Sequence, residues 1–269
     1  MDDAKTYMYG ISTTVDLTHD CRALLDLFAR HNFDFVSLSA SQEHVDFLNI
    51  EGIAALLAYA SERNLKIMSA HAPFGGRFDI ASAEHSIREQ AVEYTLKYLQ
   101  YAAQYGIPLV ILHPHYFFLD SVQSCMERAA RSLEVILLSK PDGVELAIEN
   151  LPREEGSWIC SQLLEIFDES RLGFCYDSSH ENISGPPFHL LNRHSGRVVT
   201  THLSDNHGDY DEHLVPGDGT IDWRALRSYL DRIGHLDRLL FEVGTGERLE
   251  EPVAQFVGRT AAIAREIFG

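Results

Sequence analysis

Imidazole and carboxylate side chains close one apolar run after another in this sequence. The runs IMSAH, LVILH, ELAIE, LGFCYD, VVTTH and RLLFE each have the composition of a buried strand. The candidate metal ligands at the ends of these runs, or a few residues beyond them, are His71, His113, Glu149, Asp177, His180, His202, Asp211, His213 and Glu242. A single histidine after a strand carries little information, but six consecutive runs that end in this way predict one shared site. Oxygen and nitrogen donors without sulfur suit Mn²⁺, Zn²⁺, Co²⁺ or Mg²⁺, and the imidazole content favours the transition metals.

The elements that would position these residues alternate regularly along the chain. Apolar, β-branched runs lie near residues 7–15, 35–39, 66–71, 108–113, 144–149, 172–177, 198–203 and 238–243. Helical periodicity separates them, most clearly between Ala83 and Tyr105 and in the apolar stripe from Val253 to Ile267. Eight such units predict an α/β fold in which a parallel sheet closes into a single (β/α)8 TIM barrel. The 269 residues fit one such barrel, so we expect one domain over residues 1–269.

A barrel also accounts for the positions of the candidate ligands. Parallel strands in a barrel deliver their C-terminal ends to one face, which is where active sites of this fold are built. Residues at the ends of the third to eighth runs would therefore ring one cavity. An open, doubly wound sheet is the alternative fold, and it would spread the same residues along an edge.

Composition narrows the classes of partner. The formal net charge is −18 and no run of Lys and Arg appears, so binding to long nucleic acids or anionic membranes is disfavoured. No stretch reaches the ~18 apolar residues of a membrane span. The four cysteines form no CxxC pair. We therefore expect reduced thiols in a cytoplasmic protein, with Cys175 as a small apolar residue in its strand and no zinc site built from cysteine.

Two further residues near the predicted site are candidates for substrate contacts. Arg153, in the stretch ENLPRE, is the best-placed cation for an anionic substrate group. A surface salt bridge with Glu154 or Glu155 is the alternative interpretation of Arg153. His115, in the stretch HPH, is either an additional ligand or a substrate contact.

Five longer motifs contain most of these residues. They are HAPF from His71, LHPH around His113, IENLP around Glu149, YDSSH ending at His180, and HLSDNHGDYDEHLVPGDGTIDW from His202. Their order, spacing and strand positions resemble those of the xylose isomerase-like TIM-barrel superfamily. This superfamily includes sugar phosphate isomerases and epimerases, ketose 3-epimerases and endonuclease IV. The last motif is most similar to members described as sugar phosphate isomerase/epimerase.

The epimerase branch of the superfamily implies one metal ion, held by Glu149, Asp177, His202 and Glu242. Its two glutamates would also be the catalytic acid and base on opposite faces of the sugar. One removes the proton beside a carbonyl that the metal polarises, and the other returns a proton. His180 matches a position that contacts substrate. The ketose 3-epimerases carry an Arg shortly after the position of His202, and its absence from HLSDNHG argues against that particular activity.

The endonuclease IV branch implies three zinc ions. The first would be held by His71, His113 and Glu149, the second by Glu149, Asp177, His202 and Glu242, and the third by His180, Asp211 and His213. Such a cluster would activate a hydroxide and bind a phosphodiester. All of these positions are filled, whereas the charge of −18 and a shorter loop between His202 and Asp211 argue against this branch.

The residues and the resemblance together predict a metal-dependent isomerase or epimerase of a small sugar, polyol or sugar phosphate. Glu149 and Glu242 are the expected catalytic residues, and His180, Arg153 and His115 are the expected substrate contacts. The expected cofactor is a divalent ion, Mn²⁺ or Zn²⁺, with one to three per chain. The same ligands would serve a dehydratase or a trinuclear phosphodiesterase, and a barrel that binds metal or sugar without turnover is a third alternative. Association into a homo-oligomer is left open.

Overall fold

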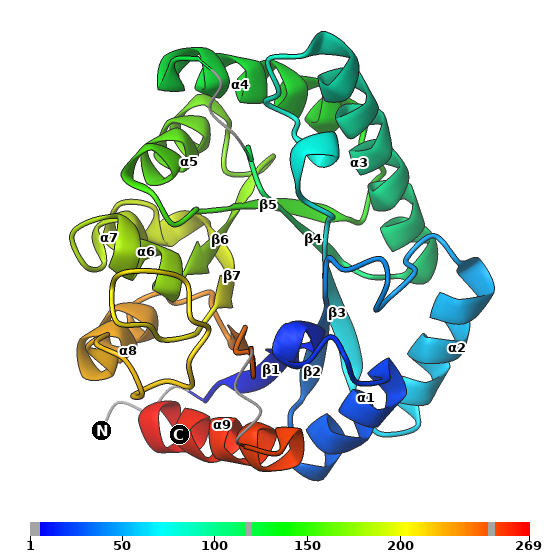
Figure 1. Cartoon of the computed structure of the whole chain (residues 1–269), viewed down its shortest axis with the longest axis vertical. Coiled ribbons are helices and arrows are strands. Elements are labelled where there is room, and N and C mark those ends of the chain that lie inside the picture. The colour runs from blue at the N-terminus through cyan, green and yellow to red at the C-terminus, as the bar shows by residue number, and fades with distance from the viewer. Residues whose placement is uncertain (1–5, 117–119, 247–250) are drawn as a thin grey trace.

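Eight parallel strands alternate with helices along the chain and form a barrel with the helices outside it (Figure 1). The computed structural model describes residues 6–116, 120–246 and 251–269. The strands are β1 (Met8–Ser12), β2 (Phe35–Leu38), β3 (Lys66–His71), β4 (Leu109–Leu112), β5 (Glu145–Glu149), β6 (Gly173–Asp177), β7 (Val198–His202) and β8 (Arg238–Phe241). The helices are α1 (Cys21–Arg30), α2 (Ile50–Ser61), α3 (His85–Tyr105), α4 (Val122–Ser139), α5 (Glu154–Ile166), α6 (Ser178–Ser184), α7 (His189–Arg193), α8 (Trp223–Asp231) and α9 (Val253–Phe268).

The sheet closes on itself. From β1 to β7 each strand pairs in parallel with the next, and β1 also pairs in parallel with β8. Leu203, directly after β7, forms a parallel bridge with Phe241, the last residue of β8, and the backbone nitrogen of Leu203 donates to the carbonyl of Leu240 at 2.9 Å. The predicted (β/α)8 barrel is confirmed. The alternative of an open sheet is wrong, because closure leaves no pair of free sheet edges.

The predicted elements form with small changes at their ends. The first strand is shorter than predicted, because residues Thr13–Val15 form a 3₁₀ helix in which the Ser12 side chain accepts a hydrogen bond from the Thr14 nitrogen. The helix predicted from Ala83 begins at His85. Among the described helices, none is both long enough and apolar enough to cross a bilayer.

Apolar side chains fill the inside of the barrel below the C-terminal ends of the strands. They are Phe35, Leu109, Ile111, Ala147, Cys175 and Leu240. A Cβ on Gly10 would lie 2.2 Å from the ring of Phe35, so only glycine in β1 leaves room for that ring. All four cysteines are buried free thiols, as predicted. Because these side chains fill the lower part of the barrel, its large cavity lies at the C-terminal ends of the strands.

Candidate metal centre

Six of the candidate ligands stand where strands end. His71, Glu149, Asp177 and His202 are the last residues of β3, β5, β6 and β7, and His113 and Glu242 directly follow β4 and β8. The other three come from the segments above this face: His180 from α6, and Asp211 and His213 from the loop between β7 and α8. The barrel therefore brings together at one face residues that are more than 170 positions apart in the chain.

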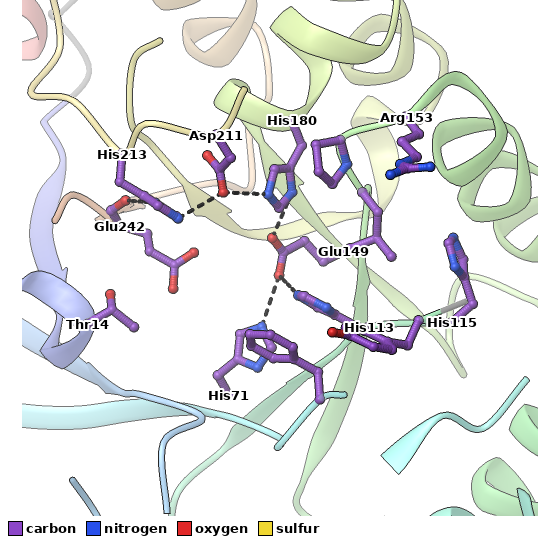
Figure 2. Close-up of a pocket in the computed structure, with 14 residues that line it drawn as sticks. Thr14, His71, His113, His115, Glu149, Arg153, His180, Asp211, His213 and Glu242 are labelled. Carbon is purple, nitrogen blue, oxygen red and sulfur yellow. Dashed lines mark hydrogen bonds and ion pairs between the residues drawn. The ribbon is translucent and has the colours of Figure 1, made fainter. Parts of the chain in front are cut away.

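Glu149 lies at the centre of this group (Figure 2). Its Oε2 atom lies 3.1 Å from His71 Nε2, 3.5 Å from His113 Nε2 and 3.2 Å from His202 Nδ1, and its Oε1 atom lies 3.2 Å from His180 Nδ1. Burial alone would raise the pKa of Glu149. The charge of His202 and the hydrogen bonds of His113 and His180 outweigh burial and hold that pKa well below its usual range. Glu149 is therefore ionised at neutral pH.

Asp177, His202 and Glu242 form a four-residue group with Glu149. One donor atom from each lies within 4.8 Å of the other three. Two atoms bound to one ion at about 2.1 Å can be at most about 4.2 Å apart, so small adjustments would place all four around one ion.

Two buried atoms of this group have an unsatisfied hydrogen-bonding capacity. Among the described residues, neither Asp177 Oδ2 nor His202 Nδ1 has a hydrogen-bond partner, although His202 Nδ1 lies 2.8 Å from Glu242 Oε2. Burial, together with the charges of Glu149 and Asp211, raises the pKa of Asp177 to about 7 against the attraction of His180. Buried carboxylates normally pair with a cation. Within the described chain, no ion pair joins Glu149, Asp177 or Glu242 to a Lys or Arg. The donor set thus fits a divalent cation.

Backbone carbonyls fix the tautomer of three further histidines. The bonds join Nδ1 of His71 to the Ala72 carbonyl at 2.7 Å, Nδ1 of His180 to the Asn150 carbonyl at 2.7 Å, and Nδ1 of His213 to the Glu242 carbonyl at 2.8 Å. A carbonyl oxygen only accepts, so Nδ1 carries the hydrogen in each ring. In a neutral ring, Nε2 then keeps a lone pair. Bonds of this kind orient histidines that ligate metals.

The Nε2 atoms of the same rings face carboxylate oxygens. His71 Nε2 lies 3.1 Å from Glu149 Oε2, while Asp211 Oδ2 lies 3.1 Å from His180 Nε2 and 2.8 Å from His213 Nε2. Two acceptors this close repel each other unless the ring is protonated or a cation lies between them. Burial lowers the pKa of His213, but its hydrogen bond to Asp211 outweighs burial and raises that pKa to about 9. Protons therefore occupy part of this cluster in the absence of metal, at positions that suit a cation.

The loop after β7 is held in place by Asp205. Its carboxylate accepts hydrogen bonds from the Gly217 nitrogen at 2.8 Å and from Trp223 Nε1 at 2.7 Å. Its backbone exchanges two hydrogen bonds with Leu214, both of 2.9 Å. Leu214 directly follows His213, which has a left-handed φ of 50°. Asp205 thus fixes the segment that carries two of the candidate ligands. Sequence reasoning did not single it out.

A cavity of about 530 Å³ opens above the cluster. In addition to seven of the candidate ligands, its lining consists of Thr14, Phe74, His115, Tyr116, Leu151, Pro152 and Arg153. Phe74 stacks on the ring of His113 with centroids 4.4 Å apart. The aromatic and apolar residues of this wall were missed by sequence reasoning, because their types do not distinguish a cavity wall from ordinary core. His115 and Arg153, predicted as substrate contacts, do line the cavity.

Cys175 lies close beneath the four-residue group. Its sulfur is within 4.8 Å of donor atoms of Glu149 and His202, so sulfur is nearer to the centre than the sequence suggested. Burial raises the pKa of the Cys175 thiol to about 12, which favours the neutral thiol over a metal-binding thiolate. The expected absence of cysteine ligation stays a prediction.

Comparison with known proteins places the chain among barrels of related architecture. A family model described as xylose isomerase-like TIM barrel matches residues 25–259. An uncharacterised protein of Methanocaldococcus jannaschii is 26% identical over 239 residues, which cover 84% of this chain and 80% of that protein. A solved structure of a D-tagatose 3-epimerase-like protein has a TM-score of 0.80 at 23% identity, covering 97% of this chain and 96% of the other. A structure of the IolI protein with a bound zinc atom has a TM-score of 0.82 at 16% identity, covering 97% and 98%. At these identities the two structures show a shared fold.

Proposed function

The chain belongs to the xylose isomerase-like TIM barrel family, and from that premise we propose that it is a divalent-metal-dependent isomerase or epimerase of a small carbohydrate. The observation that carries this proposal is the convergence of two buried glutamates, Glu149 and Glu242, with Asp177 and His202 within 4.8 Å. A sugar, a polyol or a sugar phosphate would fit a cavity of about 530 Å³, which lies within the usual range for small-molecule sites.

Glu149, Asp177, His202 and Glu242 would hold the ion. The mixture of oxygen and nitrogen donors suits Mn²⁺ or Zn²⁺. When bound, such an ion would polarise a substrate carbonyl and stabilise the negative charge that develops as the neighbouring proton leaves. The IolI protein, a structural neighbour described with a bound zinc atom, is consistent with metal binding by a protein of this fold.

The two glutamates are suited to proton transfer. They come from β5 and from the end of β8, which are not adjacent in the barrel, so they approach the cavity from different sides. Burial alone would raise the pKa of Glu242, but the charge of His202 outweighs it and lowers that pKa. Glu149 is held ionised by its own histidines. Because both are carboxylates at neutral pH, either can act as the base, and the direction of reaction decides which one takes the proton.

A phosphodiesterase with three metal ions is the second candidate function. The observation that favours it is the row in which His180, Asp211 and His213 continue outward from Glu149 (Figure 2). Against it stand the net charge of −18 and a cavity lining that contains a single Lys or Arg among the described residues. A dehydratase would use the same carboxylates, and a barrel that only binds its ligand would show no turnover.

Metal content and proton exchange test the proposal together. We expect about one equivalent of metal in protein purified without chelator, and metal-dependent incorporation of solvent deuterium beside the carbonyl of a sugar in a substrate panel. Glu149→Gln and Glu242→Gln should each slow exchange by about 10²–10⁴-fold, the usual contribution of a general acid or base. Glu145→Gln, at the opposite end of β5, is the matched control and should leave exchange unchanged. Exchange that survives chelation, or both glutamine substitutions, would overturn the proposal.

A further inference from the structure

The cavity above the metal centre has two chemically different sides. Glu242, Asp211 and His213 line one side, and Arg153 lies on the other side of Glu149 (Figure 2). Arg153 is the only Lys or Arg among the described residues that line the cavity. In a chain with a net charge of −18, one arginine in the cavity wall is a specific feature of this site.

Arg153 has no protein partner in the described structure. The side chain is exposed, and neither an ion pair nor a side-chain hydrogen bond joins its guanidinium to another described residue. The salt bridge with Glu154 or Glu155 that the sequence allowed does not form. Other arginines of the chain do pair, such as Arg128, whose guanidinium donates two bonds to Asp120 at 2.7 and 2.8 Å.

The surroundings of Arg153 favour recognition of an anion. Leu151 and Pro152 precede it in the cavity wall, and Phe74 and Tyr116 complete an apolar lining. Ion pairs are stronger beside such a wall than in open water, because the wall lowers the local dielectric constant. Guanidinium also matches the two oxygens of a carboxylate or phosphate better than ammonium does. On the opposite side, Asp211 and Glu242 would repel an anionic group.

These observations indicate both the charge of the substrate and its orientation in the cavity. We propose that the substrate carries an anionic group, a phosphate or a carboxylate, which Arg153 binds while the reacting carbon lies between Glu149 and Glu242. This inference rests on the proposed isomerase function and narrows it to acidic or phosphorylated sugars. The neutral sugar would lack the contact that fixes its orientation over the metal centre.

Binding of matched sugar pairs tests the proposal. Dissociation constants would be measured by calorimetry on the metal-loaded full chain for D-ribulose 5-phosphate against D-ribulose, D-fructose 6-phosphate against D-fructose, and D-glucuronate against D-glucose. The first two pairs test phosphate and the third tests carboxylate. We expect at least one anionic member to bind more tightly than its neutral partner. We expect Arg153→Gln to reduce that preference by about 10-fold or more, as for the loss of a hydrogen bond to a charged group.

Two control variants separate position from charge. Arg131→Gln removes the same charge from an exposed position of α4 that is not part of the cavity lining, and it should leave the preference unchanged. Arg153→Lys keeps the charge and should restore part of the preference. Equal affinity for neutral and anionic members, no binding of any anionic member, or a preference that survives Arg153→Gln would each overturn the proposal.

Solvent deuterium exchange on the same compounds separates failure of this inference from failure of the proposed function. Metal-dependent exchange into neutral sugars, with no preference for anionic ones, would overturn the inference and leave the isomerase standing. Arg153-dependent binding of an anionic sugar without exchange into any compound would overturn the isomerase and leave the anion site standing.

Discussion

Replacing Asp177 with asparagine tests whether the buried carboxylates are assembled for a cation. Burial and the nearby carboxylates raise the pKa of Asp177 from 3.8 to about 7 in the metal-free protein. Between these two pH values the folded protein keeps a proton that the unfolded chain has released, so stability falls as pH rises through this window. At ~1.36 kcal/mol for each pKa unit, the full penalty above pH 7 is up to about 4 kcal/mol.

We therefore expect Asp177→Asn to stabilise the metal-free protein at pH 8. Recovering about 2 kcal/mol of that penalty would raise the melting temperature by roughly 4–8 °C for a chain of this size. The effect on the metal-bound protein should have the opposite sign. Structural zinc sites contribute ~10–16 kcal/mol over four ligands, so losing one ligand corresponds to about 3 kcal/mol, or roughly 100-fold in affinity.

Thermal unfolding with and without chelator measures both effects in one experiment, and a direct zinc titration gives the affinity. The stabilisation of the metal-free protein should shrink as pH is lowered toward 5, because Asp177 then carries a proton in the wild type. Asp205→Asn is the matched control, because the buried Asp205 carboxylate already accepts hydrogen bonds from the N–H groups of Gly217 and Trp223. It should lower stability in both states. If Asp177→Asn also lowers stability in both states and leaves zinc affinity unchanged, Asp177 is a structural residue and the reasoning is wrong.

Two further predictions concern parts of the fold that support the site. A Cβ on Gly219 would lie 2.3 Å from the Asn206 carbonyl, so Gly219→Ala should lower the free energy of unfolding in urea by about 1–3 kcal/mol. Gly234→Ala should have little effect, because nothing lies within 4 Å of a Cβ there. Equal urea midpoints for the two variants would contradict this prediction. Burial lowers the pKa of His194 to about 4, and its ring bonds to the Ser161 hydroxyl at 2.8 Å, so the unfolded chain takes up a proton near pH 6.5 that the folded protein refuses. The contribution of His194 to the free energy of unfolding should therefore fall between pH 6.5 and 4, opposite in sign to that of Asp177, and the pH profile of His194→Gln should lack this contribution; identical pH profiles would show that His194 is not responsible.

The barrel and the ring of ligands could be predicted from sequence because both leave a repeated local signal. Each of six strands is an apolar run, and each delivers a polar residue at its end or directly after it. Repetition compensates for the weakness of each single signal. Position in the chain is enough to group Glu149 with Glu242, since parallel strands must end on the same face.

The geometry that orients the ligands leaves no such repeated signal in the sequence. Nδ1 of His71 bonds to the backbone carbonyl of Ala72, and a carbonyl is present at every position of any sequence. Asn150 lies beside Glu149, and its side-chain oxygen accepts a hydrogen bond from the Asp177 nitrogen at 2.8 Å. An asparagine in this position does not by itself indicate such a role in the sequence. Both features depend on where the backbone runs after a strand ends, which hydrophobic periodicity does not determine.

The role of Asp205 was hidden for a related reason. It lies in a stretch rich in Ser, Asp, Asn and Gly, where the pattern indicates only a loop. Its carboxylate accepts hydrogen bonds from residues as far along the chain as Trp223. Its role in holding the loop therefore depends on the path that the loop takes. A buried aspartate that organises a loop and a buried aspartate that binds a metal look the same in sequence. Only the donors around Asp205 and the unsatisfied oxygen of Asp177 separate them.

The number of ions bound decides which chemistry Glu149 can perform. The group formed with His71 and His113 and the group formed with Asp177, His202 and Glu242 share Glu149. If both groups held an ion, Glu149 would be a ligand of two cations, and a carboxylate bound in this way would be a poor proton acceptor. Full metal loading would therefore be incompatible with the proposed proton transfer through Glu149. One ion per chain would leave Glu149 able to accept a substrate proton and would support the isomerase, whereas close to three ions would leave hydroxide attack as the chemistry of this site.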